Sequence, residues 1–530
     1  MRVVGEDWQR SFVVTTVLPI VALALMYWLV ASPILGSPYW GDDHGDSQLP
    51  MQLAFNHESF YHHWINLTRE WSATTGRFFP LNIAQVGAVF YFFDTRESYK
   101  LYQFCVLALT VTLFAALVGT MLRSRWAGYA AFGFALMTLQ FKSWFDPFWE
   151  FGGQQEHWTS YFCLALLFAI VASRTRSRKW TSVVLFAGLL SLAAAALTYE
   201  SSLFMMICVP ILLWRERASF ARKALVTCAY GAVAGALFIN LLIQRSHAVV
   251  TNPGYQTSLD PHLVLRTLHH QMFNAIPLSY RYFTVHSFLP DGAGWPANVL
   301  ATVCISALFV VVMTVSVAKL LGTHRTGLKW CAIAGLVVWT IPSLFVAISA
   351  RWQLEVRPGV GYIPVLSGGL AVALLVTVGI LAIGRSLRSA NSIIPPSAPG
   401  SRLFVSLAFV SAVAAAIIIG LTASSNVEAV RDPAIVIYQV RRDAYVSAVQ
   451  NGLYSNIPVD SVISRPAGEW WNWENAVLSS WYGAPGTLTF IVPEEIATKA
   501  CGIDATCFAL VEENPQPGLI TYRLQQITAG

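Results

Sequence analysis

The chain has 530 residues, of which 55% are hydrophobic and only 12% are charged. Soluble domains carry about a quarter charged residues, so this composition excludes an ordinary water-soluble enzyme and a disordered chain. The net charge of +6 arises mainly in short basic loops between apolar stretches, and it therefore does not indicate nucleic-acid binding.

Apolar stretches long enough to cross a bilayer recur along the sequence. A helix needs about 20 apolar residues to cross the roughly 30 Å hydrocarbon layer. We therefore expect an all-α polytopic membrane protein, and the third and sixth of its spans are the shortest. The expected spans, about eleven, are residues 11–32, 101–122, 126–141, 157–173, 180–198, 201–214, 224–243, 297–318, 330–349, 363–384 and 403–423.

Lysine and arginine concentrate in one set of short loops between these spans. This set holds more than half of the 34 basic residues, including Arg123, Arg174, Arg215 and Arg385, whereas the other loops are longer and carry most of the acids. Short basic loops stay in the cytoplasm. The N-terminus is therefore expected inside, and an odd number of spans places the C-terminus outside.

The first outer loop, about residues 33–100, carries an acidic cluster directly after the first span. Asp42, Asp43 and Asp46 lie within five residues and follow the aromatic pair Tyr39 and Trp40. Carboxylates this close repel one another, which raises a pKa or binds a cation. The alternative is a solvated acidic loop, and the flanking aromatic residues favour the functional interpretation.

A metal site in this loop is a further hypothesis. Asp42, Asp43 and His44 supply ligand types, but their spacing is not diagnostic of a metal. If a cation binds there, the oxygen-rich ligands suggest Mg or Mn acting on a phosphate. The sequence therefore leaves open whether the protein uses a metal cofactor.

Further polar residues are expected on the outer side. Tyr199 and Glu200 lie in a turn between two spans, where an ionisable residue near membrane depth is a functional candidate or a simple turn acid. The loop 141–158 carries three acids that could line the same cavity as loop one. They are Asp146, Glu150 and Glu156.

The loop near 245–295 is predicted to contain a helix on the membrane surface. Asp260 is a suitable N-cap, Pro261 suits the first helical position, and Val264, Leu265, Leu268 and Met272 share one face. Four outer arginines could bind phosphate, or could simply anchor the chain at the interface. They are Arg77, Arg281, Arg351 and Arg357.

The tail from about residue 424 is predicted to be a small α/β domain. A helical stretch at 427–453 precedes strand-like runs at 459–464, 486–492, 507–512 and 519–524. Cys501 and Cys507 close a short loop there, and a structural disulfide is expected if the tail faces an oxidising compartment.

Three segments give the chain a resemblance to a known family. They are WGDDHGD (40–46), WSATTGRFFPL (71–81) and LTYESSL (197–203). Together with the multispan body and outer tail, they resemble membrane glycosyltransferases of the GT-C superfamily, in particular bacterial GtrII-like enzymes. The resemblance implies a body at 1–423 and a periplasmic domain at 424–530 of a multi-pass protein in the bacterial inner membrane.

The resemblance also implies an activity, namely transfer of a sugar from a polyprenyl phosphate to an acceptor on the outer face. Asp42 or Asp43, with Asp43 marginally preferred, would be the base of an inverting reaction. The four outer arginines would bind the donor phosphate, and Asp46, Trp71, Tyr199 and Glu200 would bind substrate. The acceptor would be an envelope glycan, such as lipopolysaccharide O-antigen, or a lipid-linked acceptor.

Two other classes of function compete with this interpretation. A transporter or lipid-glycan flippase would show internal repeats or charges at mid-membrane, and neither is evident in the sequence. A non-catalytic scaffold would dock envelope enzymes through its tail and would make the acidic cluster dispensable.

Overall fold

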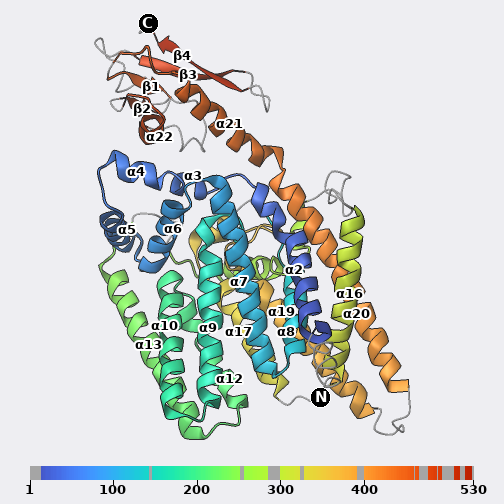
Figure 1. Cartoon of the computed structure of the whole chain (residues 1–530). Helices are drawn as coiled ribbons and strands as arrows, with labels where there is room; N and C mark the ends of the chain where they lie inside the picture. Colours follow the sequence, from blue (N-terminus) through green and yellow to red (C-terminus); the bar gives the residue numbers. More distant parts are fainter. Residues whose placement is uncertain are drawn as a thin grey trace, which may run out of the picture.

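The structure is a computed structural model. It describes residues 13–142, 146–250, 256–284, 299–322, 327–390, 399–458, 460–464, 476–485, 488–491, 507–513 and 520–527. A bundle of long helices carries a small sheet domain at one end, next to α3 (Asp43–Asp46) and α4 (Leu49–Phe55) (Figure 1). We call this the sheet end, and the opposite end of the bundle the basic end.

Nine helices within the described residues are long and apolar enough to cross a membrane. The first combines α2 (Leu18–Ala31) with the short turns η1 (Val13–Val17) and η2 (Ser32–Gly36). The others are α7 (Arg96–Leu122), α9 (Gln154–Arg174) with η3 (Phe151–Gly153), α10 (Arg178–Thr198), α13 (Phe220–His247), α16 (Val299–Leu321), α17 (Leu328–Ala347), α19 (Val365–Ala390) and α20 (Pro399–Val430). The predicted fold class, a polytopic helical membrane protein, is confirmed.

The difference between about eleven expected spans and nine long helices lies in the two shortest predictions. They correspond to α8 (Arg125–Leu136) and to the pair α11 (Ser202–Met205) and α12 (Cys208–Arg215). Glycine lets α8 approach α7 closely, since a Cβ on Gly128 would lie 2.9 Å from the carbonyl oxygen of Ala115. Close approach at small residues is the usual way in which membrane helices associate.

Loop one is largely helical, which the sequence analysis did not anticipate. After α3 and α4 come α5 (Phe60–Thr75) and α6 (Pro80–Phe92). The Ser59 hydroxyl accepts the backbone N–H of His62 and so caps α5, and Gly76 ends α5 at a φ of 69°, a left-handed value that glycine adopts without strain. Pro80 then opens α6 at the first helical position.

The predicted helix after Asp260 is confirmed as α14 (Pro261–Phe273), and the Asp260 carboxylate accepts the N–H groups of His262 and Leu263 at 2.9 and 3.2 Å. Its predicted apolar face is only partly buried. Val264, Leu268 and Met272 are half-buried and Leu265 is exposed, whereas the polar neighbours Thr267 and Gln271 are fully buried. The helix packs instead against α17, α18 (Ala350–Glu355) and α19, near α15 (Ser279–Thr284).

The tail contains all four predicted strands. They are β1 (Val462–Ser464), β2 (Thr489–Ile491), β3 (Cys507–Glu513) and β4 (Thr521–Ile527), in the order β2-β1-β3-β4. β1 pairs in parallel with β2 and β3, and β4 is antiparallel to β3. The helices α21 (Pro433–Gln450) and α22 (Ala476–Trp481) complete the tail.

Two statements about the tail, the disulfide and the domain boundary, stay predictions. Cys507 is disulfide-bonded, while Cys501 lies outside the described residues, so the pairing of these two stays a prediction. The predicted boundary between residues 423 and 424 falls within α20, which continues to Val430.

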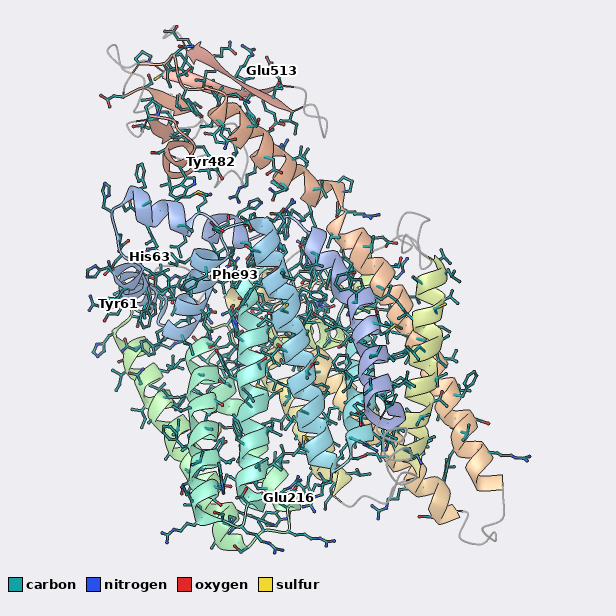
Figure 2. All side chains as sticks on the ribbon, in the orientation of Figure 1. Tyr61, His63, Phe93, Glu216, Tyr482 and Glu513 are labelled. Carbon is teal, nitrogen blue, oxygen red and sulfur yellow. The ribbon has the colours of Figure 1, made fainter. Side chains whose placement is uncertain are left out.

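Polar contacts tie the helices together at both ends of the bundle. At the basic end, the nearly buried Glu216 pairs with Arg123 and Arg174, each at 2.7 Å. Figure 2 shows Glu216 at the opposite end of the molecule from Tyr482 and Glu513 of the tail. Toward the sheet end, the Asn426 amide of α20 donates to the carbonyl oxygens of Val30 and Leu139, which joins α20 to α2 and to the segment after α8.

Candidate active site

A cavity of about 610 Å³ lies at the sheet end, bounded mainly by the helices of loop one and by the segment 351–363. Its ionisable lining consists of Asp42, Asp46, Arg77 and Arg351, together with His63 on α5, which Figure 2 labels. Its apolar lining is rich in aromatic side chains, including Trp71 and Trp352. Aromatic walls with a few convergent charges are typical of ligand sites.

Asp42 offers a carboxylate to this cavity. Its side chain is exposed toward the cavity and accepts no hydrogen bond from the part of the chain that the structure describes. Surrounding protein raises its pKa by desolvation, and the positive charge of Arg351 opposes that shift. Asp42 is therefore free to accept a proton from a bound ligand.

Asp43 points the other way and is fully buried. It accepts the Tyr99 hydroxyl at 2.6 Å and the backbone N–H of Gly152 at 3.2 Å, and Lys100 Nζ lies 3.6 Å away. Burial raises its pKa to about 6, although Lys100, Tyr99 and Gly152 lower it. With both oxygens engaged, Asp43 is poorly placed to act as a base, contrary to the marginal preference expressed above.

Asp46 completes the acidic cluster and lines the cavity beside Asp42. Its pKa is raised well above the usual carboxyl value, first by burial and then by the charges of Asp42 and Asp43. The sequence prediction that crowding would perturb this cluster is consistent with these directions.

The predicted metal ligands do not form a metal site. The described residues contain no group of three or more His, Cys, Asp or Glu side chains that could hold an ion, and Asp42, Asp43 and His44 all lie among them. His44 is buried with neither ring nitrogen hydrogen-bonded, and burial lowers its pKa to about 3. The carboxylate of Asp43 is already taken up by Tyr99, Gly152 and Lys100, so this trio does not fit a cation.

Arg77 and Glu200 form a bidentate pair at the edge of the cavity. Arg77 Nε and Nη2 donate to the two carboxylate oxygens at 3.0 and 2.9 Å. Burial acts to raise the pKa of Glu200, but Arg77 lowers it overall. The guanidinium also lies 4.5 Å from the ring centroid of Phe79 and 5.8 Å from that of Tyr199. The turn acid at 200 is thus an arginine partner, one of the roles considered for it above.

Only two of the four predicted phosphate-binding arginines line the cavity, Arg77 and Arg351. Arg351 donates to Glu355 at 2.9 Å and lies 4.6 Å from the ring centroid of Trp352. Arg281 is buried elsewhere and contacts Ser425 and Glu428 of α20. Arg357 is exposed and its side chain does not line the cavity.

The other predicted substrate-binding residues separate in a similar way. Trp71 lines the cavity and packs edge-on against Phe79 at 5.5 Å between centroids. Tyr199 is buried behind Arg77 and contacts Trp158. None of the three acids in the loop 141–158 lines the cavity, although the Glu150 carboxylate lies so close to Gly41 that a Cβ there would be 2.7 Å from Oε2.

Tyr99 and Lys100 are site residues that the sequence analysis missed. They lie near the start of α7, next to a predicted span, and Lys100 Nζ also donates to Gln103 and to the carbonyl oxygen of Trp149. A lysine at the edge of an apolar stretch is the one signal that could have identified them. Their link to Asp43 depends on tertiary contacts.

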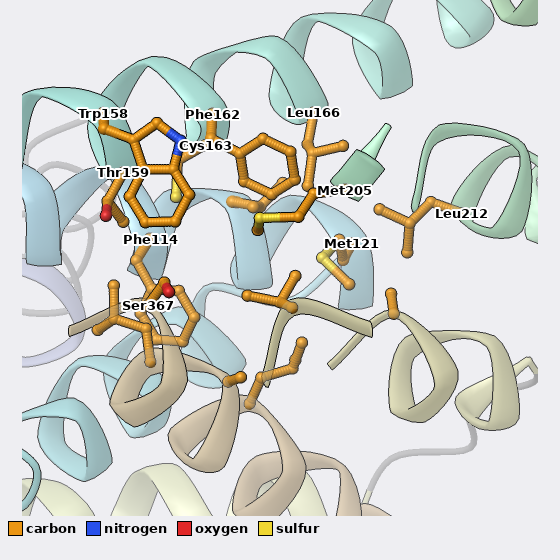
Figure 3. A pocket seen from close by; sticks show the side chains of 16 residues that line it. Phe114, Met121, Trp158, Thr159, Phe162, Cys163, Leu166, Met205, Leu212 and Ser367 are labelled. Atoms are coloured by element: carbon orange, nitrogen blue, oxygen red, sulfur yellow. The ribbon is translucent and has the colours of Figure 1, made fainter. Parts of the chain in front are cut away.

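A smaller pocket lies within the bundle among Trp158, Phe162, Met205 and other apolar side chains (Figure 3). Its volume is about 40 Å³ and its walls are almost entirely apolar. A sugar needs more space and more polar partners than this pocket offers.

Comparison with solved structures returns remote matches that cover most of this chain. An oligosaccharyltransferase from Archaeoglobus fulgidus matches with 13% identity and a TM-score of 0.43, over 90% of this chain and 64% of that one. ArnT from Cupriavidus metallidurans, bound to undecaprenyl phosphate, matches with 12% identity and a TM-score of 0.44, over 94% of this chain and 93% of that one.

These similarities are remote. This chain spans less than two thirds of the oligosaccharyltransferase, and with TM-scores below 0.5 the likeness does not by itself assign an activity. No protein-family model matches the chain. No curated protein matches it either. The function proposed next therefore rests on the cavity and its residues.

Proposed function

We propose that this protein is an inverting glycosyltransferase that moves a sugar from a polyprenyl-phosphate donor to an envelope glycan or lipid-linked acceptor. The observation that carries the proposal is the Asp42 carboxylate, which faces the same cavity as Arg351. A base and a forked cation in one cavity suit a reaction that removes a proton and releases a phosphate.

The chemistry proposed is a single displacement. The acceptor oxygen attacks the anomeric carbon as its proton passes to Asp42, and the bond between that carbon and the phosphate oxygen breaks. The electron pair of that bond remains on the lipid phosphate, where Arg351 balances the charge. Attack from the face opposite the leaving group inverts the anomeric configuration. The raised pKa of Asp42 makes its carboxylate a better proton acceptor than an ordinary one.

The remaining cavity residues take supporting roles in this proposal. Arg77 is held by Glu200, so it contributes a fixed partial charge and a shaped wall more than a free phosphate ligand. The rings of Trp352 and Tyr362 stack at 3.7 Å between centroids on the cavity wall and, with Trp71, suit packing against a sugar face. Arg281 and Arg357 have no phosphate contact in this proposal.

The proposed setting is the bacterial inner membrane, with the cavity on the periplasmic side. Support comes from the basic loops at the opposite end of the bundle, where Arg123 and Arg174 meet Glu216. An acceptor such as lipopolysaccharide O-antigen rests on the family resemblance of the sequence alone.

A gene deletion with complementation tests the proposal. We expect deletion to remove one sugar from an envelope glycan, detected by mass spectrometry, and the wild-type gene to restore it. The restored linkage, read by NMR, should have the anomeric configuration opposite to that of the polyprenyl-phosphate sugar. An unchanged glycan would contradict the proposal. Loss of the whole glycan with accumulation of its complete lipid-linked precursor would favour a flippase instead.

A further inference from the structure

Helix α21 of the tail contacts the acid-bearing segment of loop one on both sides of the acids. Before them, the backbone N–H of Tyr39 donates to the Gln439 side chain at 3.2 Å, and the Trp40 ring lies 5.2 Å from that of Tyr438. After them, Arg442 Nη1 donates to the Ser47 hydroxyl at 2.8 Å. Asp42, Asp43 and Asp46 lie between these contacts.

Arg442 is buried in an unusual setting. The residue is 6% exposed, and its guanidinium lies 4.9 Å from the ring centroid of Tyr39. No carboxylate pairs with it in the portion of the chain that the structure describes. Burying a cation without an anionic partner costs free energy. The hydrogen bond to Ser47 and the contact with the Tyr39 ring must offset that cost.

Two routes connect Arg442 to the acids. The Ser47 hydroxyl donates to the carbonyl oxygen of His44, and its backbone N–H donates to that of Asp43, so Ser47 closes the end of α3. On the other side, the Tyr39 ring stacks on Tyr99 at 5.7 Å, and Tyr99 donates to Asp43. A helix of four residues cannot hold its own geometry, because one turn barely offsets the cost of nucleation.

The tail is firm enough to serve as an anchor. Arg441 of α21 pairs with Glu512 of β3 at 3.1 Å, and Tyr445 is buried in the core of the domain. Met51 of α4 belongs to the same hydrophobic core, so a loop-one residue is packed inside the tail. Figure 2 shows Tyr482 on the side of the tail that faces α4.

We propose that the C-terminal domain clamps the acid-bearing segment and that Arg442 is the positioning residue through which it does so. This inference rests on the proposed glycosyltransferase function and assigns the tail a role in the same site. Arg442 acts through Ser47 and Tyr39 and contacts no reacting atom, so its loss should misplace Asp42 without removing any catalytic group.

The test compares Arg442→Ala, Arg442→Lys and Ser47→Ala in the full chain. Two readouts are used, namely hydrogen exchange of the 43–48 amides in nanodiscs and the sugar restored to the deletion strain. We expect Arg442→Ala to speed exchange at these amides by about tenfold or more. Transfer should fall about tenfold to a hundredfold, because small displacements of a reacting group are costly. Arg442→Lys should keep both the exchange rate and the transfer close to wild type, because lysine can also donate to Ser47 and lie over Tyr39.

Two further variants separate the possible outcomes. Arg523→Ala removes an exposed arginine that pairs with Glu513 in the same domain, and it should change neither readout. Asp42→Asn should stop transfer while leaving exchange at 43–48 unchanged. If Asp42→Asn stops transfer but Arg442→Ala does not, the clamp is wrong and the proposed function stands. If Asp42→Asn transfers normally, the proposed function itself fails.

Ser47→Ala keeps the inference falsifiable if Arg442→Ala does not insert. It removes the acceptor of the Arg442 hydrogen bond and should reproduce part of both effects. The double variant Ser47→Ala/Arg442→Lys should lose little more than Ser47→Ala alone, because both changes act on the same contact between Arg442 and Ser47. Wild-type exchange and wild-type transfer in Ser47→Ala would overturn the inference.

Discussion

Neighbouring residues in the acidic cluster have different environments. Asp42 and Asp43 are consecutive, yet Asp42 faces the cavity and Asp43 is buried against Tyr99 and Gly152. Successive residues at a helix start point about 100° apart, so only one of the pair can face a given ligand. Burial can then convert one carboxylate into a structural acceptor while the other remains available for proton transfer.

At the same scale, the Arg77–Glu200 pair should contribute measurably to stability. Its side chains are 24% and 16% exposed, and removing one partner leaves the other charge largely buried. We expect Arg77→Ala or Glu200→Ala to cost about 3 kcal/mol of folding free energy. The double variant should cost clearly less than the sum of the two. Unfolding in mixed micelles measures each value.

The matched control is Arg96→Ala. Arg96 pairs with Glu97 at 2.9 Å, but their side chains are 36% and 71% exposed, and an exposed ion pair contributes little. A cost for Arg77→Ala no greater than that for Arg96→Ala would show that the Arg77–Glu200 pair is not an effectively buried one.

At the scale of elements, packing decides which short helices join the bundle. The Gly128→Ala change on α8 should destabilise the protein by about 1–3 kcal/mol, because its Cβ would meet the Ala115 carbonyl of α7 at 2.9 Å. Thermal melting in detergent tests this. Gly231→Ala on α13 is the control, since nothing lies within 4 Å of its added Cβ. Equal melting temperatures for the two variants would contradict the packing account.

The helices and strands that the sequence predicted best are those with strong local signals, such as a capping residue or a run between turn residues. Asp260 before Pro261 marked the start of α14, and strand-like runs separated by turn residues marked the four strands of the tail. The helices of loop one were missed because α5, although amphipathic, mixes tryptophan, histidine and charge and is too polar to be recognised as a membrane span. The short helices α8 and α12 were predicted as spans because apolar composition alone does not fix helix length.

The candidate site was only partly predictable for a related reason. Local sequence patterns identified Asp42, Asp46, Arg77, Arg351 and Trp71, and the structure brings these five residues to one cavity. Arg281 has the same sequence signal but lies against α20. Neither its position nor the selection of Asp42 over Asp43 can be read from neighbours in the chain, because both depend on tertiary packing.

For the whole molecule, the tail and loop one act as one unit. The hydrogen bond between Tyr39 and Gln439 joins residues 400 positions apart, and Met51 lies in the core of the tail. A cavity bounded by loop one therefore depends on a domain encoded at the far end of the chain. No local pattern predicts such a contact, although it fixes the geometry of the proposed site.

The most direct test of this account is complementation of the deletion strain with Asp42→Asn, Asp43→Asn and Asp94→Asn, read as the fraction of envelope glycan that carries the restored sugar. Asp94 is an exposed aspartate of the same loop and serves as the matched control. Loss of a general base costs about a hundredfold or more, so Asp42→Asn should leave almost no sugar. Asp43→Asn should lose less of the restored sugar than Asp42→Asn, and Asp94→Asn should restore as much as wild type. Wild-type glycan from an Asp42→Asn protein present at normal levels in the membrane would contradict the account.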